Sequence, residues 1–254
     1  MAAFSQPASA LCGTPAGTAR AAKVDERLDI VLEDGRTVRL AGLQPPDPAG
    51  VSAEEARKAL ASWLVGKTLE LDLLGPRPDR WGRFMGDLSV PQAESARSAA
   101  AFLLAAGLAR VRPEFEAKAC SGERLAIEDE ARKAGLGLWR DPVFMPIPSS
   151  DVSALRQADA RFVLVEGRVR RVGFGRSRIY LDLVPRDGPT IVVARRLEAA
   201  LSRSGRPAQA LVGSVIRARG VMDGRFGLKL EVADPAMIEI VRNPDGSEAA
   251  EARP

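Results

Sequence analysis

The sequence predicts a mainly β protein with α-helices, an α+β fold divided into two domains. Residues 27–32 and 37–43 are rich in β-forming residues and flank the sequence EDGR, whose Asp-Gly pair favours a tight hairpin turn. Residues 142–150 contain three prolines in nine positions and read as a stiff linker. A second β-rich region follows this linker, so we expect a domain boundary near it.

The first domain alternates β-forming and helical segments. Its helices are expected to end at glycines, since glycine adopts the left-handed conformation that closes many helices. The predicted order is strands at 27–32 and 37–43, a helix at 52–65 with Ser52 as N-cap, strands at 68–74 and 83–90, and helices at 93–106 and 121–134, which end before Gly107 and Gly135.

The second domain reads as three strands, a helix and two strands. The strands are expected at 162–169, 179–184, 190–194, 214–222 and 226–231, and the helix at 197–204. This is the strand order of an OB-fold barrel, and residues 211–220 resemble the fourth strand of nucleic-acid-binding OB modules. We therefore expect a second, OB-like β-barrel.

The predicted division of the chain has five parts. They are a flexible N-terminus at 1–21, a first domain at 22–145, a proline-rich linker at 146–160, an OB-like domain at 161–242 and a disordered tail at 243–254.

Composition excludes several kinds of chemistry. The 254 residues include no histidine, which removes Ser-His-Asp and Cys-His nucleophile systems and histidine-bearing zinc sites. The net charge is +4, and the excess of Lys and Arg lies in residues 151–254, which makes that half the better candidate for contact with polyanions. No apolar run is long enough to span a membrane.

The chain has two cysteines, Cys12 and Cys120. A disulfide between them would imply an oxidising compartment, whereas two unrelated buried thiols would not. Residues 8–10, Ala-Ser-Ala, fit a cleavage site for export, although neither a basic nor an apolar segment precedes them. We expect a periplasmic or secreted bacterial protein, with a cytoplasmic location as the alternative.

Four segments together resemble the staphylococcal-nuclease (thermonuclease) family. Residues 38–47 read VRLAGLQPPD where the family has approximately Val-Arg-Leu-x-Gly-Ile-Asp-Ala-Pro-Glu, and residues 79–83 read DRWGR where it has Asp-x-Tyr-Gly-Arg. Residues 106–111, AGLARV, and 131–139, ARKAGLGLW, are similar to its later segments. The resemblance covers roughly residues 24–145 and implies a five-stranded barrel with three helices.

The resemblance implies a phosphodiesterase site with altered acidic residues. Arg39 and Arg83 stand at the family's arginine positions, and Asp47 replaces its glutamate. Gln44 replaces one calcium-binding aspartate, and an ungapped alignment puts Leu28 at the other. Family activity requires a hard cation held by carboxylates, so Ca²⁺ is expected to bind weakly or not at all.

Asp29, Gln44 and Asp47 remain weak candidates for metal ligands. Asp25 or Asp29 would have to rebuild the missing carboxylates. We expect the side chain of Asp29 to point away from the site, because a strand residue one position beyond Leu28 faces the opposite side unless a bulge intervenes.

A second candidate surface lies in the OB-like domain. Modules that hold single strands combine aromatic side chains with cations. The predicted hairpin at 170–178 offers Phe174, Arg176 and Arg178, and the next strands offer Arg217 and Arg219. Tyr180, Arg225 and Lys229 lie on neighbouring strands, although such a face is often only solvated.

Three functions follow from these patterns. The first is binding of single-stranded DNA or RNA, or of another phosphate-bearing ligand, with weak or no cleavage. The second is a divergent Ca²⁺-dependent nuclease. The third is a protein-interaction scaffold of the bacterial envelope that uses its tandem barrels and contacts no nucleic acid. Independently of these functions, the alternative to a phosphate-binding role for Arg39 and Arg83 is a structural salt bridge, for instance with Asp47, Asp79 or Asp87.

Overall fold

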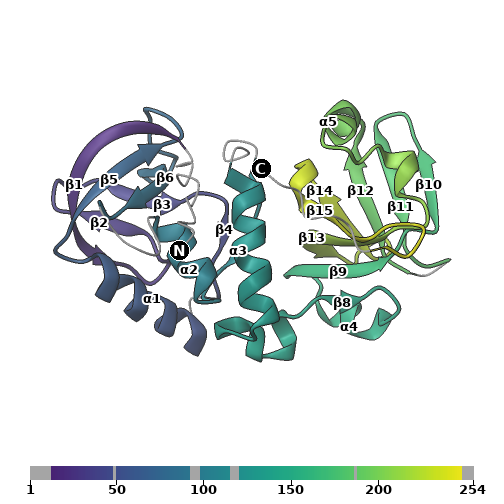
Figure 1. Ribbon diagram of the computed structural model, residues 1–254, viewed down its shortest axis with the longest axis horizontal. Coiled ribbons are helices and arrows are strands. Elements are labelled where there is room, and N and C mark those ends of the chain that lie inside the picture. The colour runs from purple at the N-terminus through teal and green to yellow at the C-terminus, as the bar shows by residue number, and fades with distance from the viewer. Residues whose placement is uncertain (1–12, 48–49, 92–97, 115–119, 186–187, 248–254) are drawn as a thin grey trace, which may run out of the picture. The chain divides into compact units, whose positions relative to one another are not determined.

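The computed structural model describes residues 13–47, 50–91, 98–114, 120–185 and 188–247. The chain divides into two compact units, one built mainly from residues before Arg140 and one from Asp141 onward. Both combine strands with helices, which confirms the predicted α+β class (Figure 1). None of the described helices has the length and apolar character needed to cross a membrane.

The first unit is a closed five-stranded barrel with strand order β1-β2-β3-β6-β5. Its strands are β1 (Thr14–Val24), β2 (Ile30–Leu32), β3 (Thr37–Leu40), β5 (Thr68–Leu73) and β6 (Arg83–Ser89). The predicted hairpin is confirmed, since Ile30 pairs with Val38 across the Asp-Gly turn. A short pair outside the barrel joins β4 (Leu43–Gln44) to β7 (Arg110–Val111).

Strand β1 corrects the prediction of a flexible segment at residues 1–21. Its residues Thr14–Val24 pair with β2 on one side and with β5 on the other, and so close the barrel. Small residues hid this strand: in the sequence TPAGTARAAKV only Ala21 and Val24 are buried. Backbone hydrogen bonds, which depend little on side-chain type, hold it in place.

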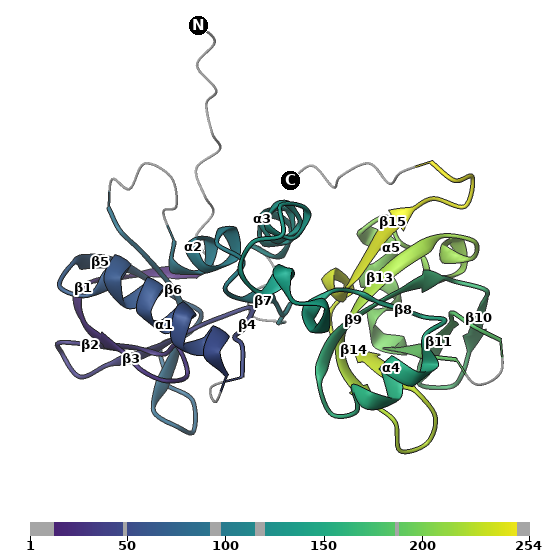
Figure 2. The same cartoon turned by 90° about the horizontal axis from the view of Figure 1, so that it is seen from below.

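Three helices accompany the barrel, as the family resemblance implied. They are α1 (Val51–Leu64), α2 (Ala99–Ala105) and α3 (Ser121–Lys133), and α2 lies beside α3 in both views (Figures 1 and 2). Gly50, rather than Ser52, is the N-cap of α1. The predicted start of α2 lies partly outside the described residues, and Ser98 caps it by accepting a hydrogen bond from the N–H of Ala101.

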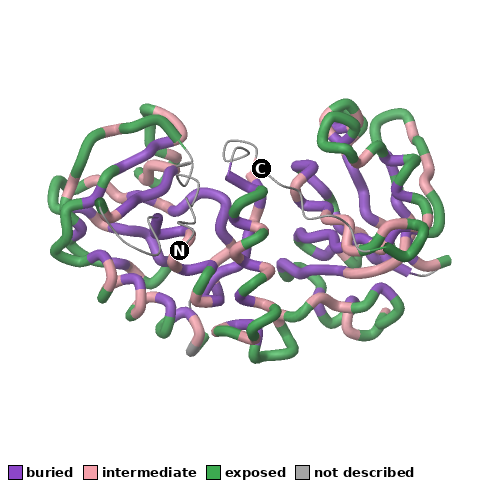
Figure 3. Tube along the Cα trace, in the orientation of Figure 1, coloured by how far each residue is buried: buried purple, intermediate pink, exposed green. Residues whose placement is uncertain are grey.

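The core of this unit is the barrel interior and the inner faces of the helices (Figure 3). Fully buried leucines from β5, β6, α1 and α2 fill it, among them Leu60, Leu71, Leu88 and Leu104. Arg124 of α3 is also buried: it donates to the carbonyl of Ala41 at 2.5 Å and to the carboxylate of Asp87 at 2.6 Å. These bonds tie α3 to β6 and to the end of β3.

Two glycine-containing motifs meet where α2 ends. Gly107 adopts a φ of +68°, and its carbonyl accepts a hydrogen bond from the N–H of Leu138 at 2.8 Å. A Cβ on Gly107 would lie 2.2 Å from the carbonyl oxygen of Leu136. The segments 106–111 and 131–139 therefore carry glycines because their backbones touch.

Cys120 is buried at the start of α3 and is disulfide-bonded. Cys12, its predicted partner, lies outside the described residues, so the pairing stays a prediction.

The second unit is built on an eight-stranded sheet ordered β10-β11-β12-β14-β13-β9-β8, with β15 beside β13. Its strands are β8 (Ile147–Pro148), β9 (Phe162–Arg168), β10 (Arg171–Phe174), β11 (Arg178–Asp182), β12 (Thr190–Ala194), β13 (Val215–Asp223), β14 (Lys229–Val232) and β15 (Ile238–Arg242). Helix α5 (Glu198–Arg203) lies between the third and fourth predicted strands, as expected, and β8, β10 and β15 were not predicted as strands.

This sheet is not closed into a barrel, so the prediction of a second barrel is wrong. The chain leaves the regular ladder at Val169 and Arg170, between β9 and β10. There the N–H of Val169 donates to Ser214 and the N–H of Arg170 donates to Asp182. The continuous segment of β9 and β10 thus pairs with β13 at its first end and with β11 at its second end, and β9 and β10 do not pair with each other.

The predicted linker at 146–160 is part of this unit's folded structure. Strand β8 pairs in parallel with β9, and helix α4 (Val152–Gln157) buries Leu155 completely in the core. Asp151 caps α4 by accepting from the N–H of Ala154. The prolines indicated an irregular segment but not its burial. Of the predicted tail, residues 243–247 form a turn and the rest lies outside the described residues.

We predict that Gly107→Ala destabilises the first unit more than Gly135→Ala. Both glycines end a helix in the left-handed conformation, at φ +68° and +61°, but a Cβ on Gly135 meets nothing within 4 Å. Conformational strain of about 1–2 kcal/mol is common to both variants, and the backbone clash adds about 1–3 kcal/mol at Gly107 alone. Urea unfolding followed by tryptophan fluorescence measures the difference; equal losses would contradict this account of the motif.

Candidate functional site

Arg39 and Arg83 lie on one face of two neighbouring parallel strands. In the register of β3 with β6, Thr37 pairs with Arg83 and Arg39 pairs with Met85. Because strand side chains alternate between faces, the side chains of residues 37, 39 and 83 share one side. Val38 and Leu40 are buried on the opposite side, in the core. The barrel therefore brings together the two arginines that the resemblance singled out.

The turn at residues 25–29 adds Asp29 to this face. The carboxylate of Asp25 accepts from the N–H groups of Arg27 and Asp29, and Leu28 adopts a φ of +63°. This left-handed residue replaces the regular alternation of a strand, so the side chain of Asp29 turns inward and is buried. The prediction that Asp29 points away from the arginines is wrong for this reason.

Arg83 forms two ion pairs at this face. Its Nη1 donates to Asp29 at 3.1 Å, while its Nε and Nη2 donate to Asp79 at 3.1 and 2.9 Å. Of the salt bridges anticipated for Arg83, the one with Asp79 is confirmed. Asp87 instead pairs with Arg124.

The pKa values of the two carboxylates that bind Arg83 are shifted in opposite directions. Burial raises the pKa of Asp29, although the hydrogen bond and charge of Arg83 and the charge of Arg39 oppose the shift. Burial also raises the pKa of Asp79, but hydrogen bonds from the Arg83 backbone, the Arg83 side chain and the Trp81 backbone outweigh it and leave the pKa lowered. Asp29 therefore takes up a proton more readily than Asp79 does.

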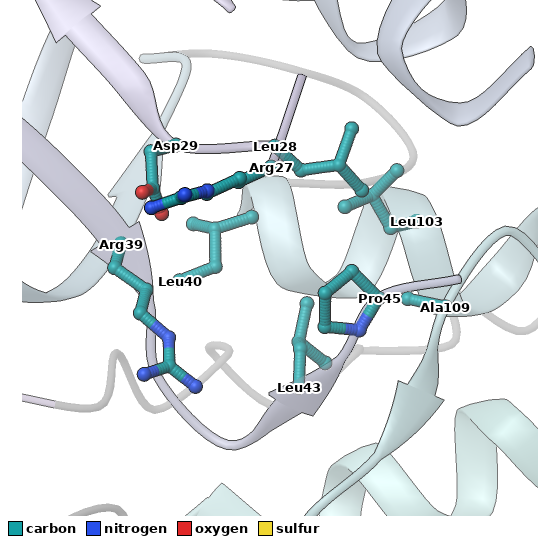
Figure 4. Close-up of a pocket in the computed structure, with 9 residues that line it drawn as sticks. All are labelled: Arg27, Leu28, Asp29, Arg39, Leu40, Leu43, Pro45, Leu103 and Ala109. Carbon is teal, nitrogen blue, oxygen red and sulfur yellow. The ribbon is translucent and has the colours of Figure 1, made fainter. Parts of the chain in front are cut away.

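A small pocket with charged and apolar sides lies beside these groups. In Figure 4 Asp29 and Arg39 lie on one side, and Leu103, Ala109 and Pro45 lie on the other. The remaining lining residues are Arg27, Leu28, Leu40 and Leu43. This arrangement places a guanidinium and a carboxylate next to an apolar surface, where charge interactions are stronger than in open water.

The other candidate ligands are less suited to calcium. Ca²⁺ takes roughly six to eight oxygen ligands, with carboxylates supplying most of the attraction. The side-chain amide of Gln44 donates to the carbonyl of Pro45 at 3.3 Å, and Asp47 is exposed. Within the described residues no group of three or more His, Cys, Asp or Glu side chains is placed to hold a metal ion. The donor set described there does not fit calcium well.

Trp81 is an exposed aromatic residue next to the site. Its side chain is 57% exposed, and the guanidinium carbons of Arg80 and Arg83 lie 3.9 and 4.9 Å from its ring centroid. Cations over an indole ring are held by its quadrupole. Trp81 belongs to the motif at residues 79–83, but the sequence pattern predicted no role for it.

In the second unit, the hairpin of β10 and β11 exposes two aromatic rings. Phe174 is 47% exposed and Tyr180 is 36% exposed. Arg176 and Arg178 are exposed on the same hairpin, and Arg178 pairs with Glu231 at 3.2 Å. Arg195, which sequence reasoning missed, places its guanidinium carbon 5.2 Å from the Phe174 ring centroid. Its distance along the chain from Phe174 concealed it.

Arg217 and Arg219 do not join this hairpin surface. Both side chains are buried: Arg217 pairs with Glu166 at 3.0 Å, and Arg219 pairs with Glu239 at 2.5 Å. The expectation of an exposed arginine face is wrong for these two residues. Strand β15, which the sequence did not predict, pairs with β13 and supplies Glu239, which lies opposite Arg217.

Comparison with known proteins bears on the first unit. Residues 37–141 match the family described as staphylococcal nuclease homologue. This part of the chain is a staphylococcal-nuclease-like domain. Over 110 residues the chain is 31% identical to a protein named ParB from Escherichia coli. That similarity covers 41% of this chain and 60% of the relative.

The match confirms the resemblance drawn from the motifs of the nuclease-like domain. It contains residues 38–47 and 79–83, and with them Arg39, Asp47 and Arg83. The matched region ends at Asp141, so it gives no family for the second unit.

We predict opposite pH dependences for Asp29→Asn and Asp79→Asn. The raised pKa of Asp29 means that the folded state holds its proton more tightly than the unfolded state, so wild type loses stability relative to Asp29→Asn as pH rises above about 4. The lowered pKa of Asp79 has the reverse sign: wild type loses stability relative to Asp79→Asn as pH falls below about 4.

Urea unfolding between pH 3 and pH 7 measures both differences. All three tryptophans, Trp63, Trp81 and Trp139, belong to the first unit, so their fluorescence reports its unfolding in the full chain. Parallel curves for the two variants would contradict the assignment of Asp29 as the buried, proton-binding member of the pair.

Proposed function

We propose that this protein binds nucleic acid through Arg39 and Arg83 of its nuclease-like domain, and that it cleaves phosphodiesters weakly or not at all. The observation that carries the proposal is the convergence of Arg39 and Arg83 on one strand face beside a pocket. Arginine recognises phosphate through a planar fork of donors. The matched family generally acts on nucleic acid, which supports the choice of ligand.

Weak cleavage follows from the acidic residues. Hydrolysis needs a cation held by carboxylates and a group that orients water. Gln44 lacks a carboxylate, Asp47 is shorter than the glutamate it replaces, and Asp29 is held by Arg83. These three features support binding over catalysis.

The hairpin of the second unit supplies further contact in this proposal. Phe174 and Tyr180 offer exposed rings on opposite faces of the hairpin; Arg195 lies over the Phe174 ring, and Arg176 and Arg178 are exposed on the same hairpin. Bases of a single strand stack on such rings with little sequence preference. We also propose that this sheet is an open relative of the OB fold, which the parallel pairing of β12 with β14 supports.

An oxidising compartment, periplasmic or secreted, is part of the same proposal. The disulfide-bonded state of Cys120 supports it, because disulfides persist mainly in such compartments.

We predict that Arg39→Gln weakens retention of labelled single-stranded DNA about tenfold at low salt. Loss of one phosphate contact also lowers the slope of log affinity against log salt by somewhat less than one. Arg57→Gln, an exposed arginine of α1 paired with Glu54, is the matched control and is expected to bind like wild type. Arg39 is preferred to Arg83 because removing Arg83 leaves Asp29 buried without its partner, which costs about 3–5 kcal/mol.

Equal retention by Arg39→Gln and wild type would count against the nuclease-like site. No retention by either protein at any salt concentration would favour the alternative of an envelope scaffold.

A cleavage assay separates the binding protein from a divergent nuclease. We expect labelled single-stranded DNA to stay intact in calcium and in chelator alike. Calcium-dependent products that disappear in both Asp29→Asn and Arg39→Gln would overturn the proposal, and would indicate that Asp29 supplies a metal carboxylate. Products that persist in both variants would point to a contaminating nuclease, which a second purification step removes before the assay is scored.

A further inference from the structure

A pocket of about 360 Å³ lies in the second unit, apart from the exposed hairpin of β10 and β11. It is formed by helix α4, the start of β12 and the loop that joins β13 to β14. The side chains that matter are Arg156, Thr190, Phe226 and Lys229. All four belong to one unit, so the pocket does not depend on how the two units sit. Its volume lies within the range of small-molecule sites.

Phe226 is the most unusual residue of this pocket. Its side chain is 85% exposed, the highest value among the exposed large hydrophobic residues of the described chain. It stands in the loop Gly224-Arg225-Phe226-Gly227, where Gly227 adopts a φ of +88° and a Cβ built on it would meet nothing within 4 Å. A phenyl ring held in water at a pocket edge offers a flat apolar face, and planar rings stack well on such a face.

Two cations line the same pocket without an ion pair of their own. Among the residues that the structure describes, the side chains of Arg156 and Lys229 make no hydrogen bond and no ion pair within 4 Å. Nearby acids are already engaged: Asp223 accepts from Arg225, Asp159 accepts from the N–H of Gly224, and Asp182 accepts from the hydroxyl of Thr190. The pocket therefore favours an anion.

We propose that this pocket binds a nucleotide, with the base stacked on Phe226 and the phosphate held by Arg156 and Lys229. A flat ring joined to a phosphate accounts for both features of the pocket at once: the exposed phenyl ring and the unpaired cations. The ligand is either a free mononucleotide or one nucleotide of a single strand. This inference goes beyond the function proposed above, because no residue of the nuclease-like domain takes part.

The test measures binding of three probes to the full chain by isothermal titration calorimetry: AMP, inorganic phosphate and a twelve-nucleotide single-stranded DNA. We expect Phe226→Ala to weaken nucleotide binding about tenfold, as loss of one stacked base does. Arg156→Gln and Lys229→Gln are expected to weaken it by a similar factor. Val212→Ala, an exposed apolar residue that does not line the pocket, and Arg203→Gln, on the surface of α5, are the matched controls.

The two sources of the ligand give different results. Tight binding of AMP that Phe226→Ala weakens supports a mononucleotide site. Binding of the oligonucleotide alone, weakened by Phe226→Ala but not by Val212→Ala, supports a subsite for a strand. For the oligonucleotide, Phe226→Ala is also combined with Arg39→Gln. A loss of binding that is specific to Phe226→Ala must persist in this double variant.

Two outcomes would overturn the inference. One is equal binding of every probe by wild type and Phe226→Ala; the other is phosphate binding as tight as AMP binding. Because Phe226 is exposed, its variant is expected to keep the unfolding midpoint of wild type, and a circular dichroism melt checks this. If Phe226→Ala leaves binding unchanged but Arg39→Gln weakens it, the proposed function stands and the inference about the pocket fails. If Phe226→Ala weakens binding but Arg39→Gln does not, the inference stands and the proposed function fails.

Discussion

Closure of the first barrel by β1 is the constraint on which its site depends. A barrel has no free edge, so every strand must find a partner on both sides. β1 meets this need by pairing with β2 and β5, and the turn that leads from β1 into β2 is residues 25–29. The backbone of that turn, with Leu28 in a left-handed conformation, then decides where Asp29 points.

The site that results is a balance of opposite charges rather than a set of free cations. Arg83 holds one buried carboxylate and one more exposed carboxylate, and Arg39 lies near enough to oppose the rise that burial causes in the pKa of the buried one. In the function proposed above, a phosphate that binds Arg39 and Arg83 must compete with these carboxylates. Such a site is preorganised, since its arginines are already oriented, but it gains less from each new contact than an unpaired arginine would.

The second unit uses its arginines in two ways. Those on β13 are buried and paired with Glu166 of β9 and Glu239 of β15. The arginines around the β10–β11 hairpin and the pocket of α4 face solvent next to exposed rings. Composition alone makes these two groups look alike, because both belong to the arginine-rich second half of the chain. Only burial separates structural arginines from those available to a ligand.

The sequence by itself determined the nuclease-like domain and the order of most of its strands and helices, and it singled out Arg39 and Arg83 as candidate site residues. Motifs carry this information because the left-handed glycines and the alternating strands that they need are local properties of the chain. The tertiary structure alone decided that β1 closes the barrel, that Asp29 faces Arg83, and that Arg217 and Arg219 are buried. These outcomes depend on backbone pairing and packing between segments distant in sequence. A local pattern of residues does not encode such long-range contacts.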